Sequence, residues 1–410
     1  MKLAIVNQPL ANRGDEAAHK AFVRELAKAF PESSIDVIFL GIKDTALIDS
    51  IRVDAVNVRC RNIRRWRLWG RTQKYTFLLH MLPLSLLHPS LRKFRKVLKS
   101  YDAVICAPGG ICMGGFMSWD HIWELETARR LGKPVFYWGR SIGPFTDEDY
   151  AHSVFKKESL SLLSYFSFLS LRDDVSVRIA QELGAHPVPV VDSAFLETPD
   201  AVIPEAVRTQ LGERYVVFVP NALTWHYRYR DVPQERIDRF HLDVMELLSE
   251  KYPGHTIVML PQTYRSVIND YGYFRRLSER AAGKPIVVID EDQSSDVQQK
   301  IIAGARMVIG ERYHSVVFAI NNRTPFVSLS YEHKMTGLLE KLGLTERSVD
   351  VQGIFADESG EACRHALEQV RSLLEQDVFV PPQLDPRAFV REGFDKLCRS
   401  IEELVQGKAG

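Results

Sequence analysis

The sequence predicts an α/β protein of two Rossmann-like domains that face a cleft, with a closing helix at the C-terminus. Short apolar runs alternate with amphipathic segments along almost the whole chain, which is typical of parallel β-sheets covered by helices. A stretch rich in proline and polar residues, 196–213, interrupts this alternation, and the same pattern starts again after it. A chain of 410 residues with 45% hydrophobic content can bury two such cores.

The first half of the chain is expected to form an N-terminal domain over residues 1–197. Strands are predicted at 2–8, 35–40, 102–110, 133–144, 167–171 and 187–195. The first helix, 15–30, has apolar residues at helical spacing and Asp15 as a plausible N-cap. Further helices are predicted at 119–132 and 172–184, and glycine-bearing turns at 12–16 and 108–115.

The second half is expected to form a C-terminal domain over residues 213–384. Its strands are predicted at 214–223, 255–262, 284–291, 305–315 and 324–334. The segment 385–410 is predicted to be a closing helix that returns to the N-terminal domain. In sheets of this kind, ligands bind beyond the carboxyl ends of the strands, so the residues that follow each apolar run are the candidates for function.

The chain is nearly neutral, but one segment is strongly basic. Residues 55–101 hold twelve Lys and Arg and no acidic residue, and a basic aromatic insertion is expected at about 59–99. Trp66, Trp69 and a leucine-rich run between the basic residues fit an interfacial element on an anionic membrane surface. Nucleic-acid binding is one alternative, although no such motif is present, and a solvated basic face over a core helix is the other.

Several function classes are disfavoured. Five cysteines without a C-x-x-C pair argue against a disulfide framework or a zinc site and favour a reducing compartment. The N-terminus lacks the features of a secretion signal, so we expect a cytoplasmic protein. No metal-ligand spacing, nucleophile elbow or G-x-G-x-x-G phosphate motif is present, and we expect neither a metal nor a cofactor.

Three groups that favour anions frame one strand-helix-strand stretch. Arg312 and His314 follow the apolar run "MVIG" at the start of a predicted helix, and Lys334 follows the next run, "FVSLSY". Neighbouring parallel strands would bring all three side chains to one cleft edge. Backbone N–H groups at the helix start add to their attraction for an anion. Each residue alone has an ordinary structural explanation, but the three together favour an anion site.

In the first half, Arg172, Arg140 and Asp192 also stand at predicted strand ends. An ion pair with a neighbouring aspartate is the alternative explanation for Arg172. Asp192 is a candidate general base if it lies opposite the anion site, whereas a solvated strand-end aspartate is its ordinary explanation.

The ordered set of motifs resembles the polysaccharide pyruvyltransferase family. The pieces that match are "NRGDEAA", Gly109–Gly110, "GKPVFYWGRSIGP", "SLRDDVS", "VDSAF", "ERYHS" and "TPFVSLSYEHKMTGLLEKLGL". The run R-x-H-S followed about twenty residues later by S-Y-x-x-K is the most specific part. Where the family often has three glycines in a row, this chain has Pro108 before Gly109 and Gly110.

The resemblance implies a GT-B-like fold and transfer of a pyruvyl group from phosphoenolpyruvate to two sugar hydroxyls, forming a ketal. Arginine suits the planar carboxylate of this donor. By the family pattern, the donor site would comprise Arg172, Arg312, His314, Ser315 and Lys334. The acceptor would be a carbohydrate, which we expect to be lipid-linked, and the enzyme would dock on the inner face of the cytoplasmic membrane.

In this scheme His314 is the expected acid or phosphate partner, because histidine has the side-chain pKa nearest neutrality, and Asp192 is the expected base. The acceptor is expected near Asp15, Gly109, Gly110 and Arg140. Tryptophans 119, 123 and 138 are possible stacking faces for the sugar.

Two other classes stay open. A nucleotide-sugar glycosyltransferase could use the same fold, although the acidic pair that retaining members commonly use is missing near Glu311. A non-catalytic sugar-binding or scaffold protein of polysaccharide assembly is the second, although the near-complete set of motifs argues against a decayed site.

Overall fold

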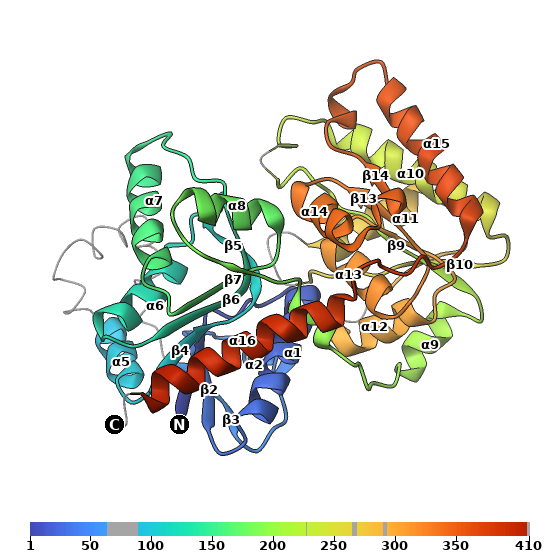
Figure 1. Ribbon diagram of the computed structural model, residues 1–410. Helices are drawn as coiled ribbons and strands as arrows, with labels where there is room; N and C mark the ends of the chain where they lie inside the picture. The colour runs from blue at the N-terminus through green and yellow to red at the C-terminus, as the bar shows by residue number, and fades with distance from the viewer. Residues whose placement is uncertain (64–88, 227, 265–268, 290–292, 408–410) are drawn as a thin grey trace. The chain divides into compact units, whose positions relative to one another are not determined.

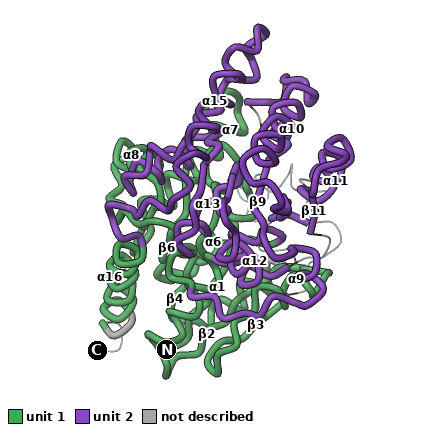
Figure 2. The backbone as a smooth tube through the Cα atoms, turned by 90° about the vertical axis from the view of Figure 1, so that its right-hand side faces the viewer, with its two compact units in different colours: residues 1–10, 18–197, 387–410 green, residues 11–17, 198–386 purple. Residues whose placement is uncertain are grey.

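A computed structural model describes residues 1–63, 89–226, 228–264, 269–289 and 293–407 of the chain. They form two compact units (Figures 1 and 2). Unit 1 comprises residues 1–10, 18–197 and 387–410, and unit 2 comprises residues 11–17 and 198–386. Most of the predicted basic insertion, including Trp66 and Trp69, lies outside the described residues.

Unit 1 is a parallel sheet with the strand order β3-β2-β1-β4-β6-β7-β8, and β5 pairs with β6. The strands are β1 (Lys2–Val6), β2 (Ser34–Leu40), β3 (Val58–Ile63), β4 (Ala103–Cys106), β5 (Gly109–Gly114), β6 (Val135–Gly143), β7 (Phe168–Leu171) and β8 (Val188–Pro189). The helices are α1 (Arg13–Ala29), α2 (Thr45–Ser50), α5 (Pro89–Leu98), α6 (Trp119–Arg130), α7 (Tyr150–Leu163), α8 (Asp174–Glu182), η3 (Ser193–Leu196) and α16 (Pro386–Gln406). The first turn of α1 and the first residue of α16 belong to unit 2.

Unit 2 is a second parallel sheet with the order β11-β10-β9-β12-β13-β14. Its strands are β9 (Tyr215–Val219), β10 (Thr256–Met259), β11 (Ile286–Val288), β12 (Val308–Gly310), β13 (Phe326–Ser330) and β14 (Ser348–Asp350). Its helices are α9 (Glu205–Leu211), α10 (Gln234–Lys251), α11 (Asp270–Arg280), α12 (Ser295–Ala303), α13 (Tyr313–Asn321), α14 (His333–Leu342), η4 (Thr345–Arg347), η5 (Ile354–Ala356) and α15 (Glu361–Gln376). Numbered within the unit, this is the doubly wound order 3-2-1-4-5-6, and the prediction of two parallel-sheet α/β domains is confirmed.

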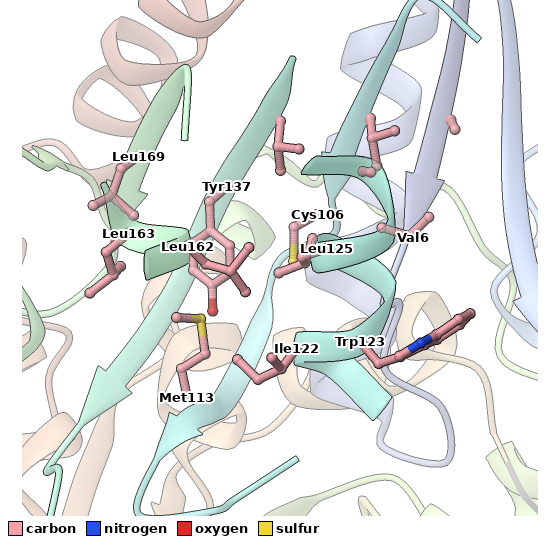
Figure 3. Packing of buried hydrophobic residues seen from close by; sticks show 14 of the residues in the cluster. Val6, Cys106, Met113, Ile122, Trp123, Leu125, Tyr137, Leu162, Leu163 and Leu169 are labelled. Atoms are coloured by element: carbon pink, nitrogen blue, oxygen red, sulfur yellow. The ribbon is translucent and has the colours of Figure 1, made fainter. Parts of the chain in front are cut away.

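One face of the unit 1 sheet packs on α5, α6 and α7. Alternate residues of β6, Val135 and Tyr137, point into this core, because successive side chains of a strand point to opposite faces. Figure 3 shows Tyr137 close to Met113 and Ile122 in this cluster. Trp123 of α6 is 5% exposed and packs on Phe94 of α5 with ring centroids 5.2 Å apart.

The other face of the unit 1 sheet is covered by α1 and α16. Trp138 of β6 stacks on Phe22 of α1 at 5.7 Å, and Phe394 of α16 packs edge-on against both rings. The helix predicted at the C-terminus is therefore part of unit 1 (red in Figure 1). Trp138 is fully buried and Trp123 is 5% exposed, so the expectation that either of them stacks on a sugar is wrong. Trp119, the third candidate, packs edge-on against Phe155 at 4.9 Å.

Three local predictions differ from the structure. The predicted glycine turn at 108–115 is largely the strand β5, whose Gly114 lies so close to the backbone of Gly143 that a Cβ would overlap it. The predicted linker contains the helix α9. The strand predicted at 187–195 shortens to β8 followed by the 3-10 turn η3.

The packing of α16 can be tested with Phe394, which is 2% exposed. Phe394→Ala should destabilise the protein by about 3–5 kcal/mol, because it leaves a cavity between Phe22 and Trp138. Chemical denaturation followed by tryptophan fluorescence measures the loss. Leu404→Ala, on the same helix but 36% exposed, is the control and should change stability by less than about 0.5 kcal/mol. Equal effects of the two changes would show that α16 does not complete this core.

Candidate functional site

The strand order of unit 2 marks one point of its sheet as a candidate site. β9 lies between β10 and β12, so the chain leaves the carboxyl ends of β9 and β12 towards opposite sides of the sheet. Ligands of doubly wound sheets bind in the crevice that this reversal creates. The loop after β9 supplies Asn221 and Trp225, and the residues after β12 are Glu311 and Arg312.

Arg312 is the N-cap residue of α13 and is 8% exposed. Its Nη2 donates a hydrogen bond to Asp270, and its guanidinium lies 5.6 Å from the centre of the Trp225 ring. Burial opposes the charged form, but Asp270 outweighs burial and the pKa of Arg312 is raised. Its Nε is buried and has no hydrogen-bond partner among the described residues. One N–H group of a fixed guanidinium is therefore not used by any of the described residues.

Asp270 is 2% exposed and stands at the start of α11. Its Oδ2 accepts hydrogen bonds from the backbone N–H groups of Gln262 and Thr263, both at 3.1 Å. Its Oδ1 accepts from Arg312. The carboxylate therefore ties the end of β10 to the end of β12, and it fixes where the arginine points.

His314 and Ser315 lie in the first turn of α13, and both are buried. The Ser315 hydroxyl donates to the Arg312 carbonyl at 2.5 Å, which anchors the start of the helix. The His314 ring packs edge-on against Tyr313 at 5.0 Å. On another side it faces Gly14, where a Cβ would overlap the imidazole.

Lys334 reaches the same edge of the sheet, because β13 pairs in parallel with β12. Its ammonium lies 5.8 Å from the centre of the Tyr313 ring and forms an ion pair with Glu332, at 2.6 Å from Oε1. Burial raises the pKa of Glu332, but Lys334 outweighs burial and lowers the pKa below its usual value. Glu332 Oε2 also lies 4.0 Å from Nε2 of His226, which follows β9. The structure thus brings Arg312, His314 and Lys334 to one strand-end edge of unit 2.

In unit 1, Arg172 and Asp192 form a buried ion pair. Arg172 Nη1 lies 2.5 Å from Asp192 Oδ2, and the two side chains are 3% and 1% exposed. Arg172 Nε also donates to Ser141 at 3.2 Å, and Asp192 Oδ1 accepts from the Ala194 backbone at 2.9 Å. Both carboxylate oxygens of Asp192 are thus engaged within unit 1. This geometry favours a positioning role for Asp192.

Arg140 lies at the carboxyl ends of the neighbouring strands β1 and β4 of unit 1. Its guanidinium donates to the carbonyls of Asn7, Ala107 and Gly110, the last two at 2.6 and 3.2 Å. Arg140 is 2% exposed and holds these strand ends together. A Cβ on Gly109 would lie 3.3 Å from this guanidinium, whereas one on Gly110 would have no neighbour within 4 Å. Of these three predicted acceptor residues, Gly110 borders open space.

The position of Asp15 differs from the prediction. It belongs to unit 2 and not to the N-terminal unit, because residues 11–17 pack with the second sheet. It is also not the N-cap, since α1 begins at Arg13 and Asn12 Oδ1 accepts from the backbone of Gly14 at 2.9 Å and of Asp15 at 3.2 Å. The first turn of α1 is therefore a neighbour of His314.

A comparison with known protein families identifies the family of this chain. The model of the family described as polysaccharide pyruvyl transferase matches residues 12–333, which is more than half of the chain. The chain belongs to this family. Arg172, Arg312 and His314 lie within the matched span, and Lys334 follows it directly.

The chain is also similar to the amylovoran biosynthesis protein AmsJ of Erwinia amylovora, with 28% identity over 282 residues. The match covers 65% of this chain and 65% of AmsJ, so the chain spans slightly less than two thirds of that relative's length.

Two solved UDP-GlcNAc 2-epimerases share the fold. The enzyme of Neisseria meningitidis has a TM-score of 0.60 at 10% identity, covering 98% of this chain and 100% of its own. The enzyme of Methanocaldococcus jannaschii has a TM-score of 0.60 at 13% identity, covering 97% and 99%. At such low identity the likeness shows the GT-B-like fold alone.

The residues that sequence reasoning missed are Trp225, Asp270 and Glu332. Asp270 forms an ion pair with Arg312 and Glu332 forms one with Lys334, as Asp192 does with Arg172. No group of three or more His, Cys, Asp or Glu side chains suited to a metal ion occurs in the described ranges. Within the same ranges, no helix is long and apolar enough to cross a membrane.

The Arg172–Asp192 pair makes a prediction about stability. Asp192→Asn should destabilise the protein by about 3–5 kcal/mol, because it leaves the arginine charge buried without its partner. The double variant Arg172→Met/Asp192→Leu should lose less, since it removes both charges. Urea denaturation of the three proteins measures the difference. A double variant less stable than Asp192→Asn would contradict this account.

Proposed function

We propose that this pyruvyl transferase moves a pyruvyl group from phosphoenolpyruvate to two hydroxyls of a sugar in a lipid-linked polysaccharide or oligosaccharide precursor, forming a ketal. The observation that carries the proposal is Arg312, a buried cation whose Nε has no partner among the described residues, beside His314 and Lys334 at the strand-end edge of unit 2. The family match supports it.

The chemistry of the donor suits this arrangement. Phosphoenolpyruvate carries a phosphate and a carboxylate on a small carbon frame, and the arginine edge matches the planar carboxylate. The side chain of the N-cap residue Arg312 makes no capping hydrogen bond to the first turn of α13. The backbone N–H groups of that turn favour the phosphate. Lys334 adds charge next to Tyr313. Arg172 is the further donor residue that the family pattern implies.

The proposed reaction balances without a cofactor. His314 gives a proton to the methylene carbon of the donor, and a sugar hydroxyl attacks the oxocarbenium-like centre that results. Phosphate leaves, and the second hydroxyl closes the ketal. Of the two hydroxyl protons, one restores His314 and the other ends on phosphate. Arg312 and Lys334 stabilise the charge that develops on the departing group.

Phosphate release from phosphoenolpyruvate tests the proposal. A lipid-extracted pool of sugar acceptors should stimulate release, and His314→Ala should lower kcat by about 10²–10⁴-fold because it removes the acid. Arg312→Ala should weaken donor binding by about 10–100-fold through loss of a charge-assisted contact. His365→Ala and Arg371→Ala, both exposed on α15, are the matched controls and should behave as wild type.

Other outcomes point to the two alternatives. Turnover of UDP-sugars without a response to phosphoenolpyruvate would favour a glycosyltransferase on the same fold. A non-catalytic scaffold predicts no thermal stabilisation by millimolar phosphoenolpyruvate. A ligand at 100 times its Kd stabilises by about 2.7 kcal/mol, so binding at the site would be visible.

We also propose that the protein works in the cytoplasm on the membrane surface. All five cysteines are free, which suits a reducing compartment. The described part of the basic segment includes α5, on which Arg92, Lys93 and Lys96 are exposed while Phe94 and Leu98 are buried. One basic face of a helix anchored in unit 1 would attract anionic lipid.

Charge reversal on α5 tests this surface. Lys93→Glu/Lys96→Glu should weaken binding to phosphatidylserine vesicles by at least about 2 kcal/mol, because each basic residue near the surface contributes about 1 kcal/mol. Co-sedimentation measures it. The control Lys157→Glu/Arg208→Glu reverses two exposed charges on α7 and α9. Equal losses in both proteins would reflect net charge and would argue against α5 as the docking face.

A further inference from the structure

The first turn of α1 is built into unit 2, although the rest of the helix belongs to unit 1 (Figure 2). The backbone N–H of Arg13 donates to the Gln262 carbonyl at 3.0 Å, which joins the turn to the loop after β10. Neither the glycine turn nor the helix predicted from the sequence indicated this contact.

Glu16 holds the turn in place. It is 1% exposed, and its Oε1 accepts hydrogen bonds from both the backbone N–H and the hydroxyl of Ser295, each at 3.0 Å. Its Oε2 pairs with the Arg13 guanidinium. Ser295 is the first residue of α12, and a carboxylate is stabilised at the N-terminus of a helix. The chain's own side chain therefore fills an anion position at this edge of unit 2.

Between Arg13 and Glu16, Gly14 faces the ring of His314. No side chain fits at this position, because a Cβ would overlap the imidazole. The ring is thus limited on this side by backbone, whose place depends on the bonds of Arg13 and Glu16. The contacts of Glu16 with Ser295 and Arg13 and the close approach of Gly14 to the imidazole are independent observations. Both concern the surroundings of His314.

We propose that Glu16 is a positioning residue for His314, acting through the first turn of α1. The proposal rests on the proposed function, in which His314 must aim one ring nitrogen at a carbon atom of the donor. Proton transfer to carbon requires a fixed approach, and a small displacement of a catalytic group costs up to about 10²-fold in rate. The site of the pyruvyl transferase then includes the motif "NRGDE", on the donor side.

The variant Glu16→Gln tests the proposal, because it keeps the shape of the side chain and removes the charge that Ser295 and Arg13 bind. We expect kcat for acceptor-dependent phosphate release to fall about 10–100-fold, with KM for phosphoenolpyruvate within about threefold of wild type. Gly14→Ala, which displaces the ring directly, should reproduce the loss of kcat with Glu16 intact.

Glu197→Gln is the matched control. Glu197 is also 1% exposed and is ion-paired with Arg24 of the same helix, but it lies in unit 1. It should lose comparable thermal stability and keep kcat within about threefold of wild type. Equal losses of kcat in the two glutamine variants, or an unchanged kcat in Glu16→Gln, would overturn the positioning role.

A second measurement separates this proposal from the proposed function. In ¹⁵N-histidine-labelled protein, the ring resonances of His314, assigned by their absence in His314→Ala, should shift in Glu16→Gln and stay in place in Glu197→Gln. If wild type releases no phosphate with any acceptor, the proposed function fails, and the resonances alone decide whether Glu16 positions the ring. Unshifted resonances in Glu16→Gln overturn the proposal in either case.

Discussion

The buried pair of Arg312 and Asp270 is the interaction on which the candidate site depends. Arg312 is 8% exposed, and a buried guanidinium needs a partner charge. Asp270 supplies that charge, while its other oxygen accepts from two backbone N–H groups after β10. The pair therefore joins two strand ends, sets the angle of the arginine over Trp225 and leaves Nε without a partner among the described residues. Unit 1 differs at the equivalent point, where Arg140 uses its donors on backbone carbonyls.

The sequence predicted the two parallel sheets because buried parallel strands are continuous apolar runs, such as Tyr215–Val219 in β9. It failed where that signal is weak. β3 carries alternating arginines because it is an edge strand, and β5 is so rich in glycine that it resembles a turn. α9 lies in a segment with two prolines, Pro199 and Pro204, so its seven residues were taken for a linker.

The cations of the site followed from the rule on strand ends, since Arg312, His314 and Lys334 each stand directly after an apolar run. Their carboxylate partners could not be predicted in the same way. Asp270 approaches from a helix 42 residues earlier in the chain, and nothing in its local sequence distinguishes it from the surface aspartates nearby. The position of Asp15 was missed because a helix is normally assigned whole to one domain, whereas α1 is divided between two units.

This division has a consequence for how the chain acquires its structure. The bond between Glu16 and Ser295 spans 279 positions, so at a synthesis rate of about 5–20 residues per second the first turn of α1 waits roughly 15–55 s for its partner. Unit 1 waits longer still for α16, which supplies Phe394 to its core. Neither sheet can complete its packing as an independent module during translation. Such non-local closure slows folding and leaves apolar surface exposed meanwhile, which makes the nascent protein a natural client for chaperones.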